Sequence, residues 1–174
     1  MDNHFRKLTR FSLEHLYTEL EKPLYNVVFR YVWDRNEAQD LVQEAFIKLW
    51  KIRDKVEMDT VRPLIYRICL NLASSRIKRK KILAFLPLER VMKEPASEGF
   101  SLEKKEEVRI LKNILNELPS RLKQTVLLTE FSDMSYDEVG KVLGIPSGTV
   151  GSRRNSAIKI MKEKFNSIYG INHE

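Results

Sequence analysis

The sequence predicts an all-α protein made of two small helical domains joined by a flexible linker, and three observations predict this fold class. Apolar residues recur at helical spacing through most of the 174 residues. All six glycines lie beyond residue 98, and no Asn-Gly or Asp-Gly hairpin turn occurs. The stretch 83–101 contains two prolines and a glycine and lacks a sustained apolar stripe. We therefore expect one domain at 1–82, a linker at 83–101, and a second domain containing a helix-turn-helix at 102–174.

Composition restricts the classes of function that the chain can have. Hydrophobic residues make up 43% and charged residues 32%, which is typical of a soluble globular protein. No apolar run approaches the roughly 20 residues that span a bilayer, and nothing targets the chain for export, so we expect a cytoplasmic protein. Cys69 is the single cysteine, which excludes an internal disulfide and a zinc ribbon. The net charge of +7 and the pI near 9.5 favour an anionic partner such as nucleic acid or an acidic protein surface.

Two helices are predicted at the start of the first domain. The first spans about 11–33, and Pro23 is expected to bend or interrupt it. The second spans about 36–53, with Asn36 as its N-cap and an apolar stripe along one side. The opposite side is polar and carries Asp40, Gln43, Glu44 and Lys48.

A third helix is expected after the capping candidates Asp59 and Thr60, with Pro63 in its first turn. It ends at a run of cations. Because cations at a helix C-terminus complement the helix dipole, this run has an explanation that needs no ligand. The cations are Arg76, Lys78, Arg79, Lys80 and Lys81.

The second domain holds a helix-turn-helix pattern. The segment 135–138 fits a capping box and opens a short helix, and Gly144 supplies the turn. Ser147 can start the second helix. The small Gly140 would let the two helices approach closely, and Val150 would fill the contact between them.

Charge favours a DNA-reading function for this motif over a helical hairpin that merely packs. Residues 147–165 hold five basic side chains against one acidic, whereas residues 119–146 hold three against four. A recognition helix places its N-terminal residues in the major groove, where arginine can pair with guanine and asparagine with adenine. Arg154 and Lys159 suit phosphate contacts. The residues expected to face outward are Ser147, Thr149, Ser152, Arg153, Asn155 and Ser156.

Several segments together resemble a known family. They are Asp40-Leu41-Val42-Gln43-Glu44-Ala45-Phe46, Tyr66-Arg67-Ile68-Cys69-Leu70-Asn71, Leu118-Pro119, Ser135-Tyr136-Asp137-Glu138-Val139 and Gly148-Thr149-Val150-Gly151-Ser152-Arg153. In this order they resemble bacterial RNA polymerase sigma factors of the extracytoplasmic-function (ECF) group of the sigma-70 family. The resemblance covers nearly the whole chain. It implies a non-catalytic promoter-recognition subunit with no cofactor, no metal and no small-molecule substrate.

The resemblance implies functions for the first domain. Its second helix would dock onto the clamp helices of the polymerase β′ subunit through Asp40, Gln43 and Glu44, which the pattern alone would interpret as a solvated face. Its third helix would recognise and melt the minus-ten element. An extruded base needs a stacking surface and a phosphate-binding track, and an amide can read a base edge. The residues implied are Arg62, Tyr66, Arg67, Asn71, Arg76, Lys78 and Arg79, with Tyr66 for stacking and Asn71 for reading.

Some of these residues also have ordinary structural interpretations, and the fit to the family is incomplete. Asn71 could be a cap or a helix-surface amide, and Trp33 and Trp50 are expected in the core or at its edge. The family often has a tryptophan at the position of Leu64, and basic residues at Gly151 and Ser156, which predicts weaker or unusual promoter contacts.

The implied partners of the second domain and of the whole chain follow from the same resemblance. The second domain would read the minus-thirty-five element through Ser147, Thr149, Ser152, Arg153, Arg154, Asn155, Ser156 and Lys159. The implied partners are core RNA polymerase (β′ clamp helices and β subunit), promoter DNA and an anti-sigma factor. The alternative is a sigma-like decoy that binds an anti-sigma protein without engaging promoter DNA. An enzyme is disfavoured, because the chain has no phosphate-binding glycine loop and its three histidines are scattered.

Overall fold

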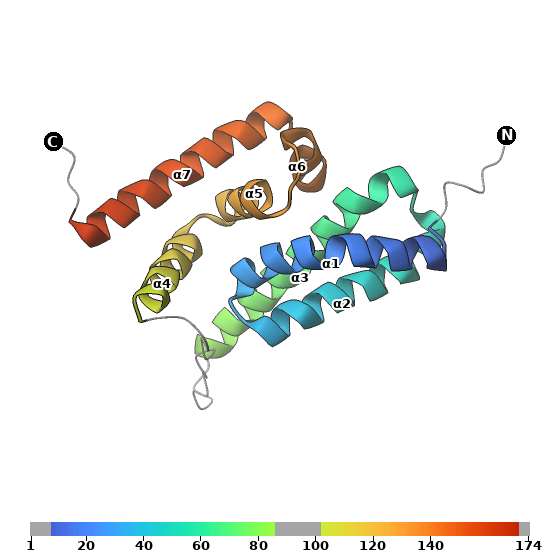
Figure 1. Cartoon of the computed structure of the whole chain (residues 1–174), viewed down its shortest axis with the longest axis horizontal. Coiled ribbons are helices and arrows are strands. Elements are labelled where there is room, and N and C mark those ends of the chain that lie inside the picture. Colours follow the sequence, from blue (N-terminus) through green and yellow to red (C-terminus); the bar gives the residue numbers. More distant parts are fainter. Residues whose placement is uncertain (1–7, 86–101, 171–174) are drawn as a thin grey trace. The chain divides into compact units, whose positions relative to one another are not determined.

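The computed structural model describes residues 8–85 and 102–170, and every regular element within these ranges is a helix (Figure 1). The predicted all-α class is therefore confirmed. The chain divides into two compact units, Met1–Lys93 and Glu94–Glu174. The linker expected at 83–101 falls outside the described residues, except for 83–85, which are helical. None of the described helices is long and apolar enough to cross a membrane.

The N-terminal unit is a bundle of α1 (Arg10–Val32), α2 (Arg35–Lys51) and α3 (Met58–Phe85), which pack against one another. Figure 1 shows α1 and α2 side by side and antiparallel, joined by a short turn. A 3₁₀ turn at Arg53–Lys55 follows α2. The apolar stripes of the three helices meet in a core whose fully buried members include Leu20, Leu24, Val28, Leu41, Leu49, Ile65 and Tyr66.

The boundaries of α1 and α2 differ from the predicted ones in ways that hydrogen bonding explains. Asp34, not Asn36, caps α2: its backbone is extended, and its Oδ1 accepts from the backbone N–H of Glu37 at 2.9 Å. Trp33 adopts a left-handed conformation (φ 59°), which ends α1 one residue before this cap. Pro23 lies inside α1 and does not interrupt it.

Helix α3 is longer than predicted at both ends. It begins at Met58, before both capping candidates, and the Thr60 hydroxyl donates to the carbonyl of Glu57 at 2.9 Å. It continues to Phe85, so the basic run lies inside the helix and its last turn holds no basic residue. The helix dipole therefore does not explain why these cations gather there, because its effect is confined to the last turn.

The C-terminal unit contains α4 (Leu102–Glu117), α5 (Ser120–Phe131), α6 (Tyr136–Leu143) and α7 (Ser147–Tyr169). The long helix α7 packs against each of the other three, and α5 also contacts α6. Its core is small and aliphatic, and its most buried members include Leu115, Leu127, Leu128, Val139, Val150 and Ala157.

The turn between α6 and α7 has the geometry that its residues predict. Ser135 and Glu138 form the expected capping box, with each side chain bonded to the other residue's backbone N–H. Gly144 has φ 69°, the left-handed conformation that glycine adopts at little cost. A Cβ at Gly140 would lie 2.6 Å from the carbonyl oxygen of Ile145, so only glycine allows this close approach. The helix-turn-helix prediction is confirmed in the C-terminal unit.

Candidate functional site

The outward face of α2 is polar and carries the three residues predicted for docking. Asp40 and Gln43 are exposed, whereas Glu44 is half-buried and forms an ion pair with Lys48 at 3.1 Å. The same face also carries Ile47, whose side chain is 56% exposed. The sequence offered a signal for it, because Ile47 falls outside the apolar stripe of α2, four residues after Gln43. A single exposed isoleucine is ordinary on a protein surface, but Ile47 lies next to Leu13, Phe46 and Trp50, and a contiguous apolar patch marks an interaction site.

A shallow apolar groove of about 430 Å³ adjoins Ile47, between the start of α1 and the end of α2. Leu13, Phe46 and Trp50 contribute its apolar lining. The guanidinium of Arg53 lies over the Trp50 ring, 4.2 Å from its centre, in a cation–π contact. Trp50 is half-buried and Trp33 is buried, which confirms the expectation that both belong to the core or its edge.

Tyr66, predicted as a stacking surface for a melted base, is instead a core residue. Its side chain is 0% exposed, and it is among the largest fully buried side chains of the chain. The prediction is wrong for this structure because a ring enclosed by its own core has no face for a base. Asn71 and Arg67 are exposed on the same helix, one and two turns before the basic run. Cys69 is buried as well, and this burial raises the pKa of its thiol.

The cations predicted for the minus-ten region differ in how tightly the protein holds them. Arg62 forms an ion pair with Glu19 at 3.2 Å. Glu37, only 9% exposed, accepts from Lys80 at 2.6 Å and lies 3.8 Å from Arg76. This carboxylate of α2 thus holds two cations of α3, a pairing that no pattern in the sequence indicates. Lys78 and Arg79 are exposed.

The first turns of α7 present a row of exposed small and polar residues. Ser152, Asn155, Ser156 and Lys159 are all exposed, and Gly148 precedes them. The hydroxyls of Ser152 and Ser156 donate to carbonyls of their own helix, at 3.1 Å and 3.0 Å, so toward an outside partner each is left as an acceptor.

The remaining residues predicted for this helix are less exposed. Ser147, Thr149, Arg153 and Arg154 are half-buried. At 100° per residue around the helix, Arg153 and Arg154 lie on either side of the buried stripe of Val150 and Ala157. They do not lie in the middle of the exposed row. In a DNA major groove, both arginines would suit the phosphates at the edges better than the base edges on the floor.

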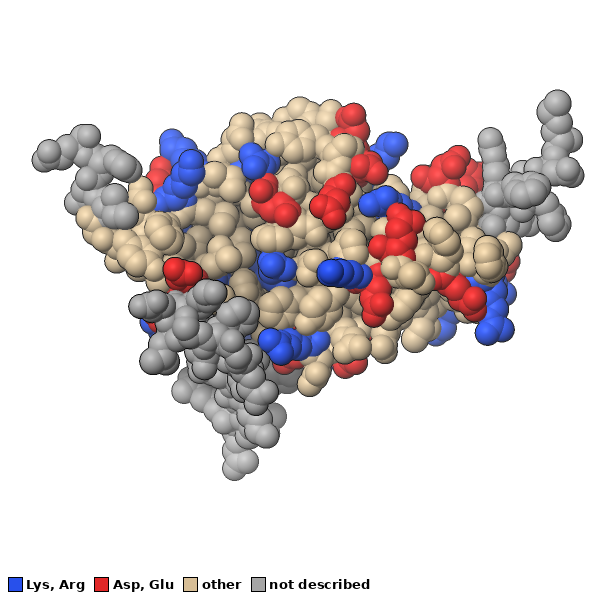
Figure 2. Space-filling view, in the orientation of Figure 1, with Lys and Arg blue, Asp and Glu red and all other residues tan. Residues whose placement is uncertain are grey.

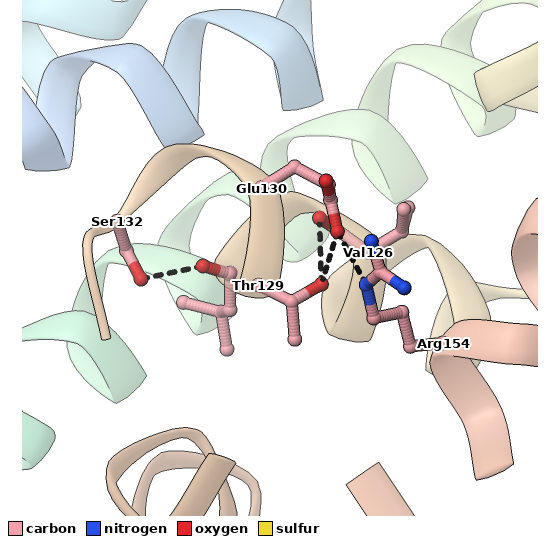
Figure 3. Close-up of polar contacts among 6 residues, drawn as sticks. Val126, Thr129, Glu130, Ser132 and Arg154 are labelled. Atoms are coloured by element: carbon pink, nitrogen blue, oxygen red, sulfur yellow. Dashed lines mark hydrogen bonds and ion pairs between the residues drawn. The ribbon is translucent and has the colours of Figure 1, made fainter. Parts of the chain in front are cut away.

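Arg154 is held by an acidic side chain from α5 (Figure 3). Its Nε donates to Oε1 of Glu130 at 2.6 Å, and the Thr129 hydroxyl donates to the same oxygen at 3.1 Å. This hydrogen bond lowers the pKa of Glu130 and raises the pKa of Arg154. Beside them, the Tyr136 ring covers Gly151, at 3.4 Å from the position that a Cβ would occupy.

The electrostatics of α7 favour an anionic ligand at its start. Its first turn holds no acidic residue that would offset the positive end of the helix dipole. Elsewhere the charges are mixed: Figure 2 shows lysine and arginine side chains interspersed with aspartate and glutamate on the face that it draws. On that face, any anion-binding surface is therefore confined to single elements.

Comparisons with known proteins match both units. The family model "Sigma-70 region 2" matches residues 16–82, and "Sigma-70, region 4" matches residues 109–161. RNA polymerase sigma factor SigV of Bacillus subtilis is 27% identical over 90% of this chain and 93% of its own length. ECF RNA polymerase sigma factor SigW of the same organism is 26% identical over 83% and 84%. Among solved structures, sigma factor RpoE of Bartonella quintana, in complex with the anti-sigma factor NepR, has a TM-score of 0.65 at 22% identity and covers 88% of this chain and 96% of that one.

Proposed function

The chain belongs to the ECF group of the sigma-70 family, and we propose that its two units divide promoter recognition between them. Sigma factors bind core RNA polymerase and direct it to promoters, so the protein is a transcription initiation factor and not an enzyme. In this proposal the N-terminal unit docks on polymerase and opens the minus-ten element. The C-terminal unit reads the minus-thirty-five element. We place the protein in the cytoplasm, where polymerase works.

The docking surface is the outward face of α2. We assign Asp40, Gln43 and Glu44 to the clamp helices of the β′ subunit, and we add Ile47. The observation that supports this is the exposure of an isoleucine among carboxylates and amides on one helix face. Such a face combines an apolar anchor with polar groups that fix orientation, as protein interfaces do.

The minus-ten surface is the exposed side of α3. Asn71 is placed to read a base edge, and Arg67, Lys78 and Arg79 to contact phosphates. Arg62 and Arg76 already pair with carboxylates, so we assign them a supporting position beside the strand. Tyr66 has no place in this surface because it is buried.

The upstream surface is the exposed row of α7. Asn155 is placed for a base contact, Ser152 and Ser156 as acceptors, and Lys159 for a phosphate. Gly148 adds no side chain to the exposed first turn of the helix, and Ser147 and Thr149 flank it. Arg153 and Arg154 suit phosphates at the groove edges.

An anti-sigma factor is a further partner that we propose. The similar fold of Bartonella RpoE is seen with such a factor bound, and this chain presents an apolar groove beside its proposed docking face. A protein that covered the groove and Ile47 would compete with polymerase for the same surface.

Two substitutions with crossed expectations test the division of function. Gln43→Ala should weaken binding to core polymerase about five- to thirtyfold, because an interface residue of moderate energy contributes about 1–2 kcal/mol. Asn155→Ala should leave that binding unchanged and should reduce the preference of holoenzyme for an intact over a scrambled upstream element. The loss should correspond to about 1–3 kcal/mol, the usual value of one base contact.

Each variant is the control for the other, since both side chains are exposed and neither is part of the core. The measurements are polymerase affinity by fluorescence anisotropy of the labelled full chain, and transcription from promoters with intact and scrambled upstream elements. Normal polymerase binding by Gln43→Ala would remove the docking assignment. Loss of polymerase binding by Asn155→Ala would refute the division between units.

A further inference from the structure

The ion pair between Glu130 and Arg154 places an acidic side chain beside α7, the helix proposed to bind DNA. Glu130 is the residue before the end of α5, and its carboxylate reaches α7 seven residues after Ser147. Both side chains are about one-third exposed. A carboxylate beside the phosphates of DNA lowers the affinity for DNA. The repulsion is compensated only if a cation neutralises the carboxylate or if the carboxylate aids DNA binding in another way.

The geometry of the pair shows what that function can be. Arg154 contacts the carboxylate through Nε, the guanidinium nitrogen nearest its stem (Figure 3). The guanidinium also has a hydrogen bond with the Tyr136 side chain, and its two terminal nitrogens extend beyond the bond to Glu130 (Figure 3). Thr129 donates to the same carboxylate oxygen and so fixes Glu130 in turn. A guanidinium anchored in this way loses less side-chain freedom when it binds a second anion than a mobile one does.

Tyr136 forms the third side of this arrangement. Its ring packs against Gly151, one turn before Arg154 on the same face of α7, and the Tyr136 side chain also supports the charged state of Arg154. A longer side chain at 151 would have to displace the ring. Three helices thus meet at one guanidinium: α5 through Glu130, α6 through Tyr136 and α7 through Arg154 itself.

We propose that Glu130 is a positioning residue for upstream promoter recognition: it holds Arg154 so that the terminal nitrogens of the guanidinium bind a DNA phosphate at the edge of the groove. This inference rests on the proposed function of α7. A phosphate is the fitting ligand because Arg154 lies on the flank of α7, about 100° around the helix from the exposed Asn155. The arrangement places a fixed cation one turn after Gly151, a position that provides none.

The test is Glu130→Gln in the full-length protein bound to core polymerase. The substitution removes a negative charge, so simple electrostatics predicts tighter DNA binding. If Glu130 positions Arg154, the substitution should instead weaken DNA binding. The affinity of holoenzyme for promoter DNA should fall about three- to tenfold, part of what one charge-assisted hydrogen bond contributes. The DNA probe is a promoter recovered by sequencing the 5′ ends of RNA that the wild-type holoenzyme makes from genomic DNA.

Glu117→Gln is the matched control. Glu117 pairs with Lys164, so this variant also removes an acidic partner of α7 and the same charge, but at the other end of the helix. It should change the affinity for promoter DNA less than twofold. Arg154→Lys serves as a second variant, because it keeps the charge but cannot donate from one edge while binding with another. It should show the same loss as Glu130→Gln, and combining the two should add little further loss.

The outcomes separate the inference from the function on which it rests. Unchanged or increased affinity of Glu130→Gln holoenzyme for promoter DNA, beside a wild type that depends on the upstream element, overturns the positioning role and leaves the proposed function intact. An equal loss in Glu117→Gln also overturns it, because any ion pair that anchors α7 would then have the same effect. A wild type with no upstream dependence overturns the proposed function of α7, and the positioning role with it.

Discussion

Gly140 and Gly151 belong to neighbouring helices of the C-terminal unit, but their surroundings differ. A Cβ at Gly140 would lie 2.6 Å from a backbone oxygen, whereas a Cβ at Gly151 would lie 3.4 Å and 3.7 Å from atoms of the Tyr136 ring, an ordinary contact. We predict that Gly140→Ala lowers the free energy of unfolding by about 1–3 kcal/mol, the usual effect of overpacking. We predict that Gly151→Ala leaves it unchanged or raises it by up to about 1 kcal/mol, because alanine is the better helix former.

Denaturation of the full chain followed by circular dichroism measures both effects. The two variants are chemically identical, so a difference in sign can only come from their sites. Equal shifts in the two variants would show that α6 and α7 are not packed as closely as the structure has them.

Single residues also show where sequence reasoning succeeded and where it failed. The positions of Ser135, Gly140 and Gly144 were predictable, because caps and turns depend on local chemistry. The burial of Tyr66 was not predictable from its motif, because a tyrosine on a helix can face either side and only packing decides. The pair of Glu130 and Arg154, 24 residues apart, left no pattern in the sequence.

At the scale of helices, the N-cap of α2 separates two neighbouring candidates. Asp34 accepts the backbone N–H of Glu37, whereas Asn36 is exposed within the first turn. We predict that Asp34→Ala destabilises the N-terminal unit by about 1 kcal/mol, the usual value of a lost N-cap. Asn36→Ala should not destabilise it, since alanine suits a helix interior better than asparagine.

Urea denaturation followed by tryptophan fluorescence is the suitable measurement, because Trp33 and Trp50 are the only tryptophans and both lie in the N-terminal unit. The midpoint for Asp34→Ala should fall, and that for Asn36→Ala should not. A larger fall in the urea midpoint for Asn36→Ala than for Asp34→Ala would show that Asn36 is the N-cap, as the sequence alone predicts.

The three helices of the N-terminal unit and the two of the helix-turn-helix were predicted from the sequence, whereas α4, α5 and the exact helix ends were not. Apolar periodicity marks a helix over many residues, so the three helices of the N-terminal unit were all expected. A helix end depends on which of several candidate residues caps it. In α3 the position of the end decides whether the basic run lies at the helix terminus or inside the helix. Its extension to Phe85 moves the basic run into the helix and turns a dipole-stabilised terminus into a charged surface.

At the scale of the whole molecule, charge and architecture support one function. Residues 1–81 carry 17 basic and 11 acidic side chains, and residues 119–174 carry 8 and 6. Each unit has its own core and its own exposed polar surface. A chain with two separate modules can contact two promoter elements and polymerase at once, so that modest single affinities combine. The sequence could predict this organisation because two separate motifs lie on either side of a stretch rich in turn residues.

The most direct test of the sigma function is transcription itself. Purified full-length protein is mixed with bacterial core RNA polymerase and fragmented genomic DNA, and the 5′ ends of the RNA are sequenced beside a reaction without the protein. We predict protein-dependent starts that share two sequence elements at a fixed spacing upstream, and fewer of these starts with Gln43→Ala at protein concentrations that do not saturate polymerase. Binding of an anti-sigma protein without any protein-dependent start would contradict this function and would indicate a decoy.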